Sequence, residues 1–429
     1  MTTKSGVATV LMVVATPALI ALATRMGTLG LAGAFVVAAG LLGLAVLGRA
    51  GMAVVVLGLA FATAPMYRGI GSVGPVTPTD AFLLIGLVLL LPSLFDRSLS
   101  LPPGFLLAIV ALTVIGLVSS ANNASPVIAL VYLIQWLVVF AGLPVFLVMW
   151  GPSRKVIDGL LACYVAGQVA SIGKAFLTGP IAAGRYMGFS HHPNDFGLAG
   201  GVAVVILLYL LPHCKEAWLR VAVLGLIALN LYSVIMSGSR GVTLAVAVVV
   251  VLIPIAERSG VWALLLTFAG AIGLALLPLV VKFGGSGGAF ARLAGDQTSA
   301  GSDSLRSTAL GDGWKRLLHS PFLGSGLDPT VGDYHNLFLE VPIAFGIFGL
   351  AAYLVICYVF ARPLFTRHPL HRLSYLTWLF LIVGVTFPGI NDRTIAVPLS
   401  MAILAAVPAV ASRSADVRPA AEPVPGGVR

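Results

Sequence analysis

The sequence predicts an all-α fold: a polytopic helical membrane bundle of 12–14 transmembrane segments, with one large extracytoplasmic loop that carries short helices. The first observation is composition, because 59% of the 429 residues are hydrophobic and only 9% are charged, whereas a soluble domain carries about 25% charged residues. The mean hydropathy is +1.04. Second, apolar stretches of about 20 residues, enough to cross a bilayer core of ~30 Å, recur along most of the chain. Third, one long polar interruption occupies residues 282–334. A soluble enzyme is excluded.

Charges and Pro/Gly pairs divide the chain into 14 apolar segments. In order they are 6–24, 28–47, 51–66, 80–95, 103–119, 127–150, 156–178, 195–212, 217–236, 241–256, 260–281, 336–361, 373–389 and 394–411. Lys4 and the long apolar run after it predict a first span rather than a cleavable signal. Short segments such as 51–66 fit a half-span as well as a full one, so the expected count is 12–14.

The segments group into four parts. Residues 1–281 and 335–411 are the N-terminal and C-terminal parts of the membrane bundle, residues 282–334 are the large loop, and residues 412–429 are a disordered cytoplasmic tail. The tail is rich in Pro, Ala and Gly, a composition that cannot form a core. A loop as long as 282–334 in an otherwise economical bundle is usually functional.

Lysine and arginine predict the orientation of the bundle. With the N-terminus inside, 14 of the 25 lie on the inner side and 11 on the outer side. Five of those 11 lie in the long loop, where the positive-inside rule is weak. We therefore expect a multi-pass protein of the cytoplasmic (inner) membrane with both termini in the cytoplasm and the large loop outside. The net charge of +10 follows from this asymmetry and predicts no nucleic-acid partner.

Signals for cofactors are missing from the sequence. The three cysteines, Cys163, Cys214 and Cys357, are isolated and form neither a disulfide framework nor a metal-ligand spacing. A nucleotide-binding glycine loop is also missing. The sequence therefore predicts no cofactor and no metal. The Gly-Ser-Gly at 324–326 is interpreted as a turn.

Three arginines in Gly-rich or polar outer segments are candidate ligands for an anion. Arg185 precedes the His-His-Pro sequence that ends at Asn194, Arg240 lies in a Ser-Gly-Ser-Arg-Gly turn, and Arg306 lies in the large loop. Arginine binds phosphate oxygens through two parallel hydrogen bonds and stays charged, so this trio suits a pyrophosphate group. The alternative for each is a snorkelling or topology residue at a helix end, which is the favoured interpretation for Arg393.

Helical periodicity predicts where Arg306 points. At 100° per residue one stripe contains Arg306, Leu310, Trp314 (or Gly313) and Leu317. Because this apolar stripe should lie on the membrane bundle, Arg306 should point inward with it. Lys315 should face water.

A histidine at the end of the large loop is the candidate general base. His335 is followed by Asn336 and, one turn into the next span, by Glu340. Histidine is the usual general base near neutral pH, although a lone histidine at a helix start is equally often a cap or an interface residue. An ionisable residue such as Glu340 inside a span indicates a functional or network position.

These motifs together resemble the O-antigen ligase/polymerase superfamily of membrane glycosyltransferases. The resemblance covers mainly residues 184–350. It rests on Arg185-Tyr-Met-Gly with His-Pro-Asn194, on Ser-Gly-Ser-Arg-Gly241, and on Trp314…Pro321-Phe-Leu-Gly-Ser-Gly326…His335-Asn336…Phe345-Gly346. In ligases of this family an Arg-x-x-x-Leu element and a histidine at the end of the loop are functional, which maps onto Arg306–Leu310 and His335. The ligases' histidine-to-glycine spacing is only approximated by His335…Gly346, so ligase and polymerase both stay open.

The resemblance implies transfer of a glycan from an undecaprenyl-pyrophosphate donor to an acceptor hydroxyl outside the cytoplasmic membrane. The acceptor would be lipid A-core for a ligase and another lipid-linked glycan for a polymerase, with membrane lipids as further partners. We expect a metal-independent, inverting transferase facing the periplasm. His335, Arg306 and Arg240 are the expected catalytic residues, and Arg185, Asn194, Asn336 and Glu340 are the expected substrate-binding residues.

Two alternatives belong to other classes. A transporter or flippase of lipid-linked oligosaccharides would commonly show internal repeats, and the sequence shows none. A transferase with an acidic base and a metal would need carboxylates in the first outer loop, and residues 25–28 contain none. The sequence identifies neither the sugar nor the oligomeric state.

Overall fold

The computed structural model of the chain describes residues 40, 42–66, 69, 76–94, 100–181, 184–283, 288–293, 300–327, 334–390 and 392–408. Every regular element among these residues is helical, which confirms the predicted all-α fold. The α-helices are α2 (Pro78–Leu90), α3 (Pro103–Ala121), α4 (Pro126–Leu137), α5 (Leu143–Trp150), α6 (Arg154–Thr178), α7 (Pro193–Leu210), α8 (Ala217–Met236), α9 (Arg240–Glu257), α10 (Gly260–Phe283), α11 (Ala289–Leu293), α12 (Ala300–His319), α13 (Leu337–Ala361), α14 (Tyr375–Val383), α15 (Arg393–Leu399) and α16 (Ile403–Ala406).

Eight helices of the described part are long and apolar enough to cross a membrane, as a polytopic membrane protein requires. They span Leu42–Met66, Pro103–Ala121, Pro126–Trp150, Arg154–Thr178, Pro193–His213, Ala217–Met236, Arg240–Glu257 and Leu337–Phe365. Three shorter apolar helices accompany them: Pro78–Leu90, Gly260–Gly273 and Arg393–Ala406. The predicted span 6–24 and the predicted tail 412–429 lie outside the described residues.

The boundary expected at Arg49 coincides with a kink. Segments 28–47 and 51–66 were divided there, and one helical stretch runs through this point from Leu42 to Met66. Gly48 within it has a φ of 68°, which lies outside the helical range and which glycine takes without a steric penalty. The two expected segments therefore meet at a kink and not at a loop.

The central helix is α7, whose side chains are buried along nearly its whole length. Its small residues explain this burial. A Cβ at Gly197 would lie 2.3 Å from the Ser237 hydroxyl oxygen, and one at Gly200 would lie 2.4 Å from that of Ser233. Close approach of helix backbones at small residues is the usual way in which membrane helices associate. The start of α7 is thereby held against the turn between α8 and α9.

Helix α13 is broken at Gly346 (φ 68°, ψ −177°), and residues 320–326, which we call the strap, fill the break. The strap donates two backbone hydrogen bonds to carbonyls before the break, from Ser325 to Ile343 (2.8 Å) and from Gly326 to Ala344 (3.0 Å). After the break, the Ile347 N–H donates to the Pro321 carbonyl (2.9 Å). The interpretation of 324–326 as a simple turn is therefore incomplete, because these residues replace the hydrogen bonds that α13 loses.

Charged side chains gather at opposite ends of α7 and α9. At one end lie Arg185 and Arg240. At the other end Arg372 forms two 2.7 Å hydrogen bonds with Glu257, while Tyr209 donates to Asp158 (2.9 Å). The 18 residues of α9 separate the two groups by about 27 Å, close to the thickness of a bilayer core.

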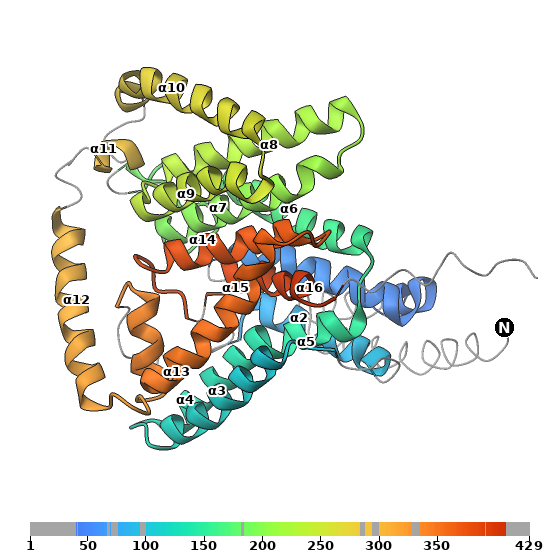
Figure 1. Cartoon of the computed structure of the whole chain (residues 1–429), viewed down its shortest axis with the longest axis vertical. Coiled ribbons are helices and arrows are strands. Elements are labelled where there is room, and N and C mark those ends of the chain that lie inside the picture. The colour runs from blue at the N-terminus through green and yellow to red at the C-terminus, as the bar shows by residue number, and fades with distance from the viewer. Residues whose placement is uncertain are drawn as a thin grey trace, which may run out of the picture.

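Helix α12 lies apart from the rest of the bundle, along one side of the molecule and crosswise to α8, α9 and α10 (Figure 1). Its inner face packs on α13, where Leu310 and Leu317 contact a cluster of Tyr334, Leu339 and Ile343. Gly313 makes this close packing possible, because a Cβ there would lie 2.7 Å from a Leu339 methyl.

Candidate functional site

The turn between α8 and α9 positions three arginines. The Ser237 carbonyl accepts a hydrogen bond from Arg185 Nε (2.7 Å), and the next carbonyl, Gly238, accepts one from Arg292 Nη1 (2.8 Å). Arg240 is the first residue of α9. Gly238 has a φ of 67°, and Ser237 Oγ accepts the Ser239 N–H (3.1 Å). The sequence Ser-Gly-Ser-Arg therefore forms a tight turn whose adjacent carbonyls orient two guanidinium groups beside a third.

Arg185 is held by its backbone as well as by its side chain. Gly184 has a φ of 69°, and the Tyr186 N–H donates to the Met236 carbonyl at the end of α8 (3.0 Å). Arg185 Nη2 donates to Asn194 Oδ1 (2.6 Å). The structure thus brings Arg185 and Asn194, both expected as substrate ligands, into direct contact.

Helix α12 brings a fourth arginine and a carboxylate to the same place. Asp303 forms an ion pair with Arg240, and Arg306 is half-buried on the inner face with Leu310. The predicted inward stripe is correct for Gly313 and wrong for Trp314, which is 58% exposed. Gly313 lies on the inner face because only a residue without a side chain fits against Tyr334 and Leu339. The side chain of Lys315 is 81% exposed, as expected.

We call Arg185, Arg240, Arg292 and Arg306 the arginine cluster. Burial, followed by repulsion from Arg292 and Arg306, lowers the pKa of Arg185 to about 10. Burial and the charge of Arg240 also lower the pKa of Arg306. The hydrogen bond from Arg240 lowers the pKa of Asp303, so this carboxylate stays ionised. The four cations repel one another, and an anion bound among them would relieve that repulsion.

Two histidines lie beside the arginine cluster. His192 caps α7, because its Nδ1 accepts the Asn194 N–H (3.1 Å). Desolvation, and then repulsion from Arg185, His335, His191 and Arg306, lowers the pKa of His192 to about 4. A neutral ring whose Nδ1 accepts a hydrogen bond has its proton on Nε2, so His192 is suited to donate a hydrogen bond and not to accept a proton.

His335 is the second histidine. It is close enough to His192 for their charges to interact, and its φ is 52°. A side chain other than glycine in this left-handed region costs of order 1–3 kcal/mol, and such residues cluster at functional sites. The strained backbone therefore makes His335 a candidate functional residue.

Asn336 and Glu340 have structural contacts. Asn336 Oδ1 accepts the Leu339 N–H (3.2 Å) and caps α13. Glu340 is buried and its Oε2 accepts the Gly389 N–H (3.2 Å), which ties α13 to the segment before α15. These contacts hold the helix that follows His335. Their expected contact with substrate stays a prediction.

Arg393 lies outside the arginine cluster. Its guanidinium forms an ion pair with Asp80 (2.9 Å) and a hydrogen bond with Gln135 (3.3 Å). The residue is 4% exposed, so the snorkelling interpretation is wrong. Asp80 also caps α2 with Thr77, and this group of residues joins α2, α4 and α15.

Sequence reasoning missed Arg292, which is buried and lies in the short helix α11. Positive residues in the large loop were discounted there as topology signals of little weight. The available signal was its residue type, because arginine rather than lysine in an extracytoplasmic loop suits the bidentate recognition of phosphate.

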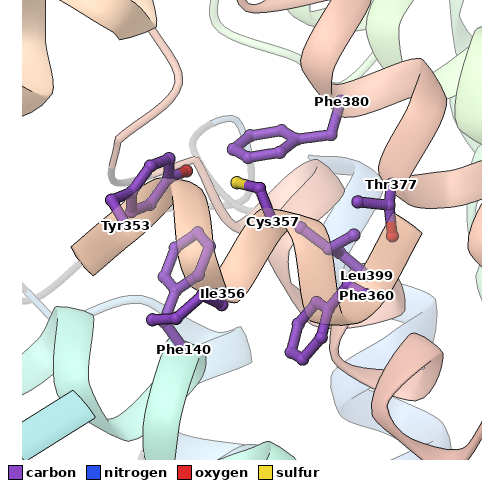
Figure 2. A pocket seen from close by; sticks show the side chains of 8 residues that line it. All are labelled: Phe140, Tyr353, Ile356, Cys357, Phe360, Thr377, Phe380 and Leu399. Atoms are coloured by element: carbon purple, nitrogen blue, oxygen red, sulfur yellow. The ribbon is translucent and has the colours of Figure 1, made fainter. Parts of the chain in front are cut away.

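A small cavity lies within the bundle, and none of its lining residues belongs to the arginine cluster (Figure 2). Aromatic side chains such as Phe140, Phe360 and Phe380 line it, together with Cys357 and Thr377. Tyr353, which also lines it, lies in the part of α13 that follows the break at Gly346. Among the described residues, no group of three or more His, Cys, Asp and Glu side chains could hold a metal ion, and independence from metal stays a prediction.

Comparison with protein families finds a match within the chain. Residues 223–354 match a family model described as O-Antigen ligase. The matched segment begins in α8 and ends in α13, so it contains the Ser237–Arg240 turn, α11, α12 and His335. A search of curated proteins finds no match. The family resemblance inferred from the sequence motifs is confirmed.

Proposed function

We propose that this chain, whose residues 223–354 match the O-Antigen ligase family model, transfers a glycan from an undecaprenyl-pyrophosphate donor to an acceptor hydroxyl. The single observation that carries the proposal is the arginine cluster, in which one turn orients Arg185 and Arg292 beside Arg240. A diphosphate is the anion that this arrangement suits, because several guanidinium groups can each bind two of its oxygens.

The reaction breaks one bond and forms one. The acceptor hydroxyl oxygen attacks the anomeric carbon of the donor sugar, and the bond between that carbon and the phosphate oxygen breaks. The bonding electrons remain on the departing diphosphate, whose growing charge the arginine cluster stabilises. Attack on the face opposite the leaving group inverts the anomeric configuration. The stored energy of the donor bond makes a nucleotide or a metal unnecessary.

His335 takes the proton of the acceptor hydroxyl in this proposal. Two observations support His335 rather than His192 as the base. The Nδ1 of His192 already accepts the Asn194 N–H, whereas the strained backbone of His335 fixes its ring at the end of the large loop. In the proposed site Arg185 and Asn194 bind the diphosphate, while Asn336 and Glu340 hold the start of α13.

The proposed site faces the periplasm. Lys and Arg counts predict this orientation, and the separation of charged groups at opposite ends of α9 supports a bundle with two distinct faces. Cysteine labelling in intact cells should find residues 300–319 outside and residues 366–372 inside. The large loop in the cytoplasm would contradict the proposal. Ligase and polymerase differ only in acceptor, either a lipid A-core or a second lipid-linked glycan.

The test uses two substitutions of His335. His335→Ala should lower transfer by about 10²–10⁴-fold, the contribution of a positioned general base, while purified protein still binds the undecaprenyl-pyrophosphate glycan. His335→Gly should lose transfer equally, yet unfold at a higher temperature than His335→Ala, because glycine removes a left-handed penalty of about 1–2 kcal/mol. Loss of activity in the more stable variant cannot result from misfolding.

Three outcomes would count against the proposal. Full turnover in both variants would exclude His335 as the base. Loss of activity on addition of EDTA would contradict metal independence. Movement of the donor across the bilayer without a new glycosidic bond, whichever acceptor is supplied, would favour the transporter alternative.

A further inference from the structure

The last turns of α12 and the strap expose large apolar side chains. Leu318 is 73% exposed, Phe322 63% and Trp314 58%. Trp314 and Leu318 belong to a helix that is otherwise rich in Ser, Gly and charged residues, and Phe322 lies in the strap that follows it. A polar helix in water would be expected to carry polar side chains at such positions, so this exposed set needs an explanation. We call Trp314, Leu318 and Phe322 the apolar patch.

Packing of α12 on the protein does not explain the apolar patch. The inner face of the helix already contacts α13 through Leu310 and Leu317, and Gly313 brings the two helices into close contact. The patch lies beside this inner face rather than on it. Its three side chains are therefore available to a second surface.

The apolar patch is continuous with the lipid-facing surface of α13. The Phe322 ring stacks on the Phe348 ring, with centroids 6.1 Å apart. Phe348 and its neighbour Ile347 are both exposed, and they begin the part of α13 that follows the break at Gly346. That part belongs to a helix long enough to cross the membrane, so the surface beside Phe322 is one that lipid covers.

The strap also lies at the level where two other membrane helices end. Asn123, in the turn between α3 and α4, donates to the Ser325 carbonyl (2.5 Å). A Cβ at Gly326 would lie 3.0 Å from Ser120 Cα, at the end of α3. Because α3 and α4 are crossing helices joined by this turn, the turn marks the membrane surface, and the strap lies at that surface.

We propose that the apolar patch inserts into the lipid leaflet on the side of the arginine cluster, at the boundary between headgroups and acyl chains. Tryptophan is enriched at this boundary, where its ring meets apolar chains and polar headgroups together. Amphipathic helices lie in the interface with their apolar face about 5–10 Å deep. The C-terminal end of α12 is the anchored end, and Arg306 and Asp303 lie nearer its other end.

The experiment measures the depth of Trp314 in the full-length protein, reconstituted into lipid nanodiscs so that water reaches both faces. The nanodiscs contain phospholipids brominated either near the glycerol backbone or near the chain ends. The fluorescence of Trp314 is obtained by subtracting the emission of the Trp314→Phe variant from the emission of the wild-type protein. We expect the shallow bromines to remove most of this fluorescence, the deep bromines to remove little of it, and aqueous iodide to remove little of it.

A matched control moves the indole by one residue. In the double variant Trp314→Phe and Lys315→Trp, the ring turns about 100° around the helix, to a position where the side chain is exposed. Iodide should quench this indole more strongly than the bromines do. Iodide quenching of Trp314 without bromine quenching would overturn the proposal. Quenching of Trp314 by neither iodide nor bromine would also overturn it, because this would indicate burial against a second protein copy. Equal bromine quenching of the indoles at positions 314 and 315 would overturn it as well.

Discussion

Arg185 and Ser237 are 52 positions apart in the sequence, and a 2.7 Å hydrogen bond joins Arg185 Nε to the Ser237 carbonyl. This bond uses one edge of the guanidinium and leaves Nη2 to donate to Asn194 (2.6 Å). The side chain is therefore fixed at two points before any substrate binds. Fixed donors cost less to align with a developing charge than mobile donors do, which is what a site for a departing diphosphate requires.

Arg185→Lys should therefore impair transfer although it preserves the charge. An ammonium group cannot donate to Ser237 and Asn194 from the two edges of a planar fork. We expect a loss of about 10²-fold in kcat, as found when one aligned donor is removed from an active site. Lys315→Ala is the control, since Lys315 is exposed and away from the arginine cluster. Equal effects of the two changes would show that only the total positive charge matters.

The sequence predicted the helical membrane fold and three of the four residues of the arginine cluster. Composition and segment length predicted the helical membrane bundle, because lipid imposes a strict requirement for long apolar helices. Residue type predicted Arg185, Arg240 and Arg306. Their convergence could not be predicted, because it depends on the carbonyls of Ser237 and Gly238, and any residue provides a carbonyl. Arg292 was missed because positive residues in the large loop were discounted as topology signals.

Asp303→Asn should strengthen diphosphate binding. In the structure the Asp303 carboxylate pairs with Arg240. If Arg240 binds a diphosphate oxygen, as we propose, the substrate must displace this carboxylate. An exposed pair of this kind contributes about 0.2–1 kcal/mol, which corresponds to an affinity increase of up to about fivefold. Asp312→Asn is the matched control on the same helix, because Asp312 pairs with Lys315 on the exposed face. Calorimetric titration with a polyprenyl diphosphate measures both variants.

Weaker diphosphate binding in Asp303→Asn would contradict this interpretation. It would mean that Asp303 positions Arg240 for the substrate rather than competing with it. An equal change in Asp312→Asn would indicate a general effect of net charge.

The protein should become less stable in mild acid because His192 takes up a proton more readily in the unfolded chain than in the folded protein. The pKa of His192 in the folded protein is about 4, below the ordinary 6.5, so the unfolded chain takes up the proton first as pH falls. The contribution of the neutral His192 ring to the free energy of unfolding is complete above pH 6.5 and is lost as the pH falls towards 4. His192→Asn keeps a good N-cap that does not titrate. Its unfolding temperature in detergent should fall less between about pH 7.5 and about pH 5 than that of wild type. Parallel pH dependence in the two proteins would refute the assignment.

The break in α13 illustrates a different limit of sequence reasoning. Residues 336–361 are apolar apart from Asn336 and Glu340 and predict one continuous span. The break becomes favourable only because the strap supplies the missing partners, such as the Pro321 carbonyl for the Ile347 N–H. Such a pairing joins two segments that periodicity treats separately, so neither segment alone predicts it.

Gly346→Ala should therefore destabilise the protein far more than an ordinary helical substitution. The φ and ψ of Gly346 (68° and −177°) lie in a region that is essentially restricted to glycine and costs other residues of order 1–3 kcal/mol. A Cβ there would also lie 1.9 Å from the Phe322 carbonyl oxygen, so the strap must move.

Gly159→Ala in α6 is the control, because nothing lies within 4 Å of its Cβ position and alanine favours a helix by about 1 kcal/mol. Thermal unfolding in detergent should give a lower midpoint for Gly346→Ala and an unchanged or higher one for Gly159→Ala. Displacement of the strap should also loosen the end of α12, so Gly346→Ala should lose transfer even at temperatures where it remains folded. Equal midpoints and equal activity in the two variants would show that α13 has no need of the break.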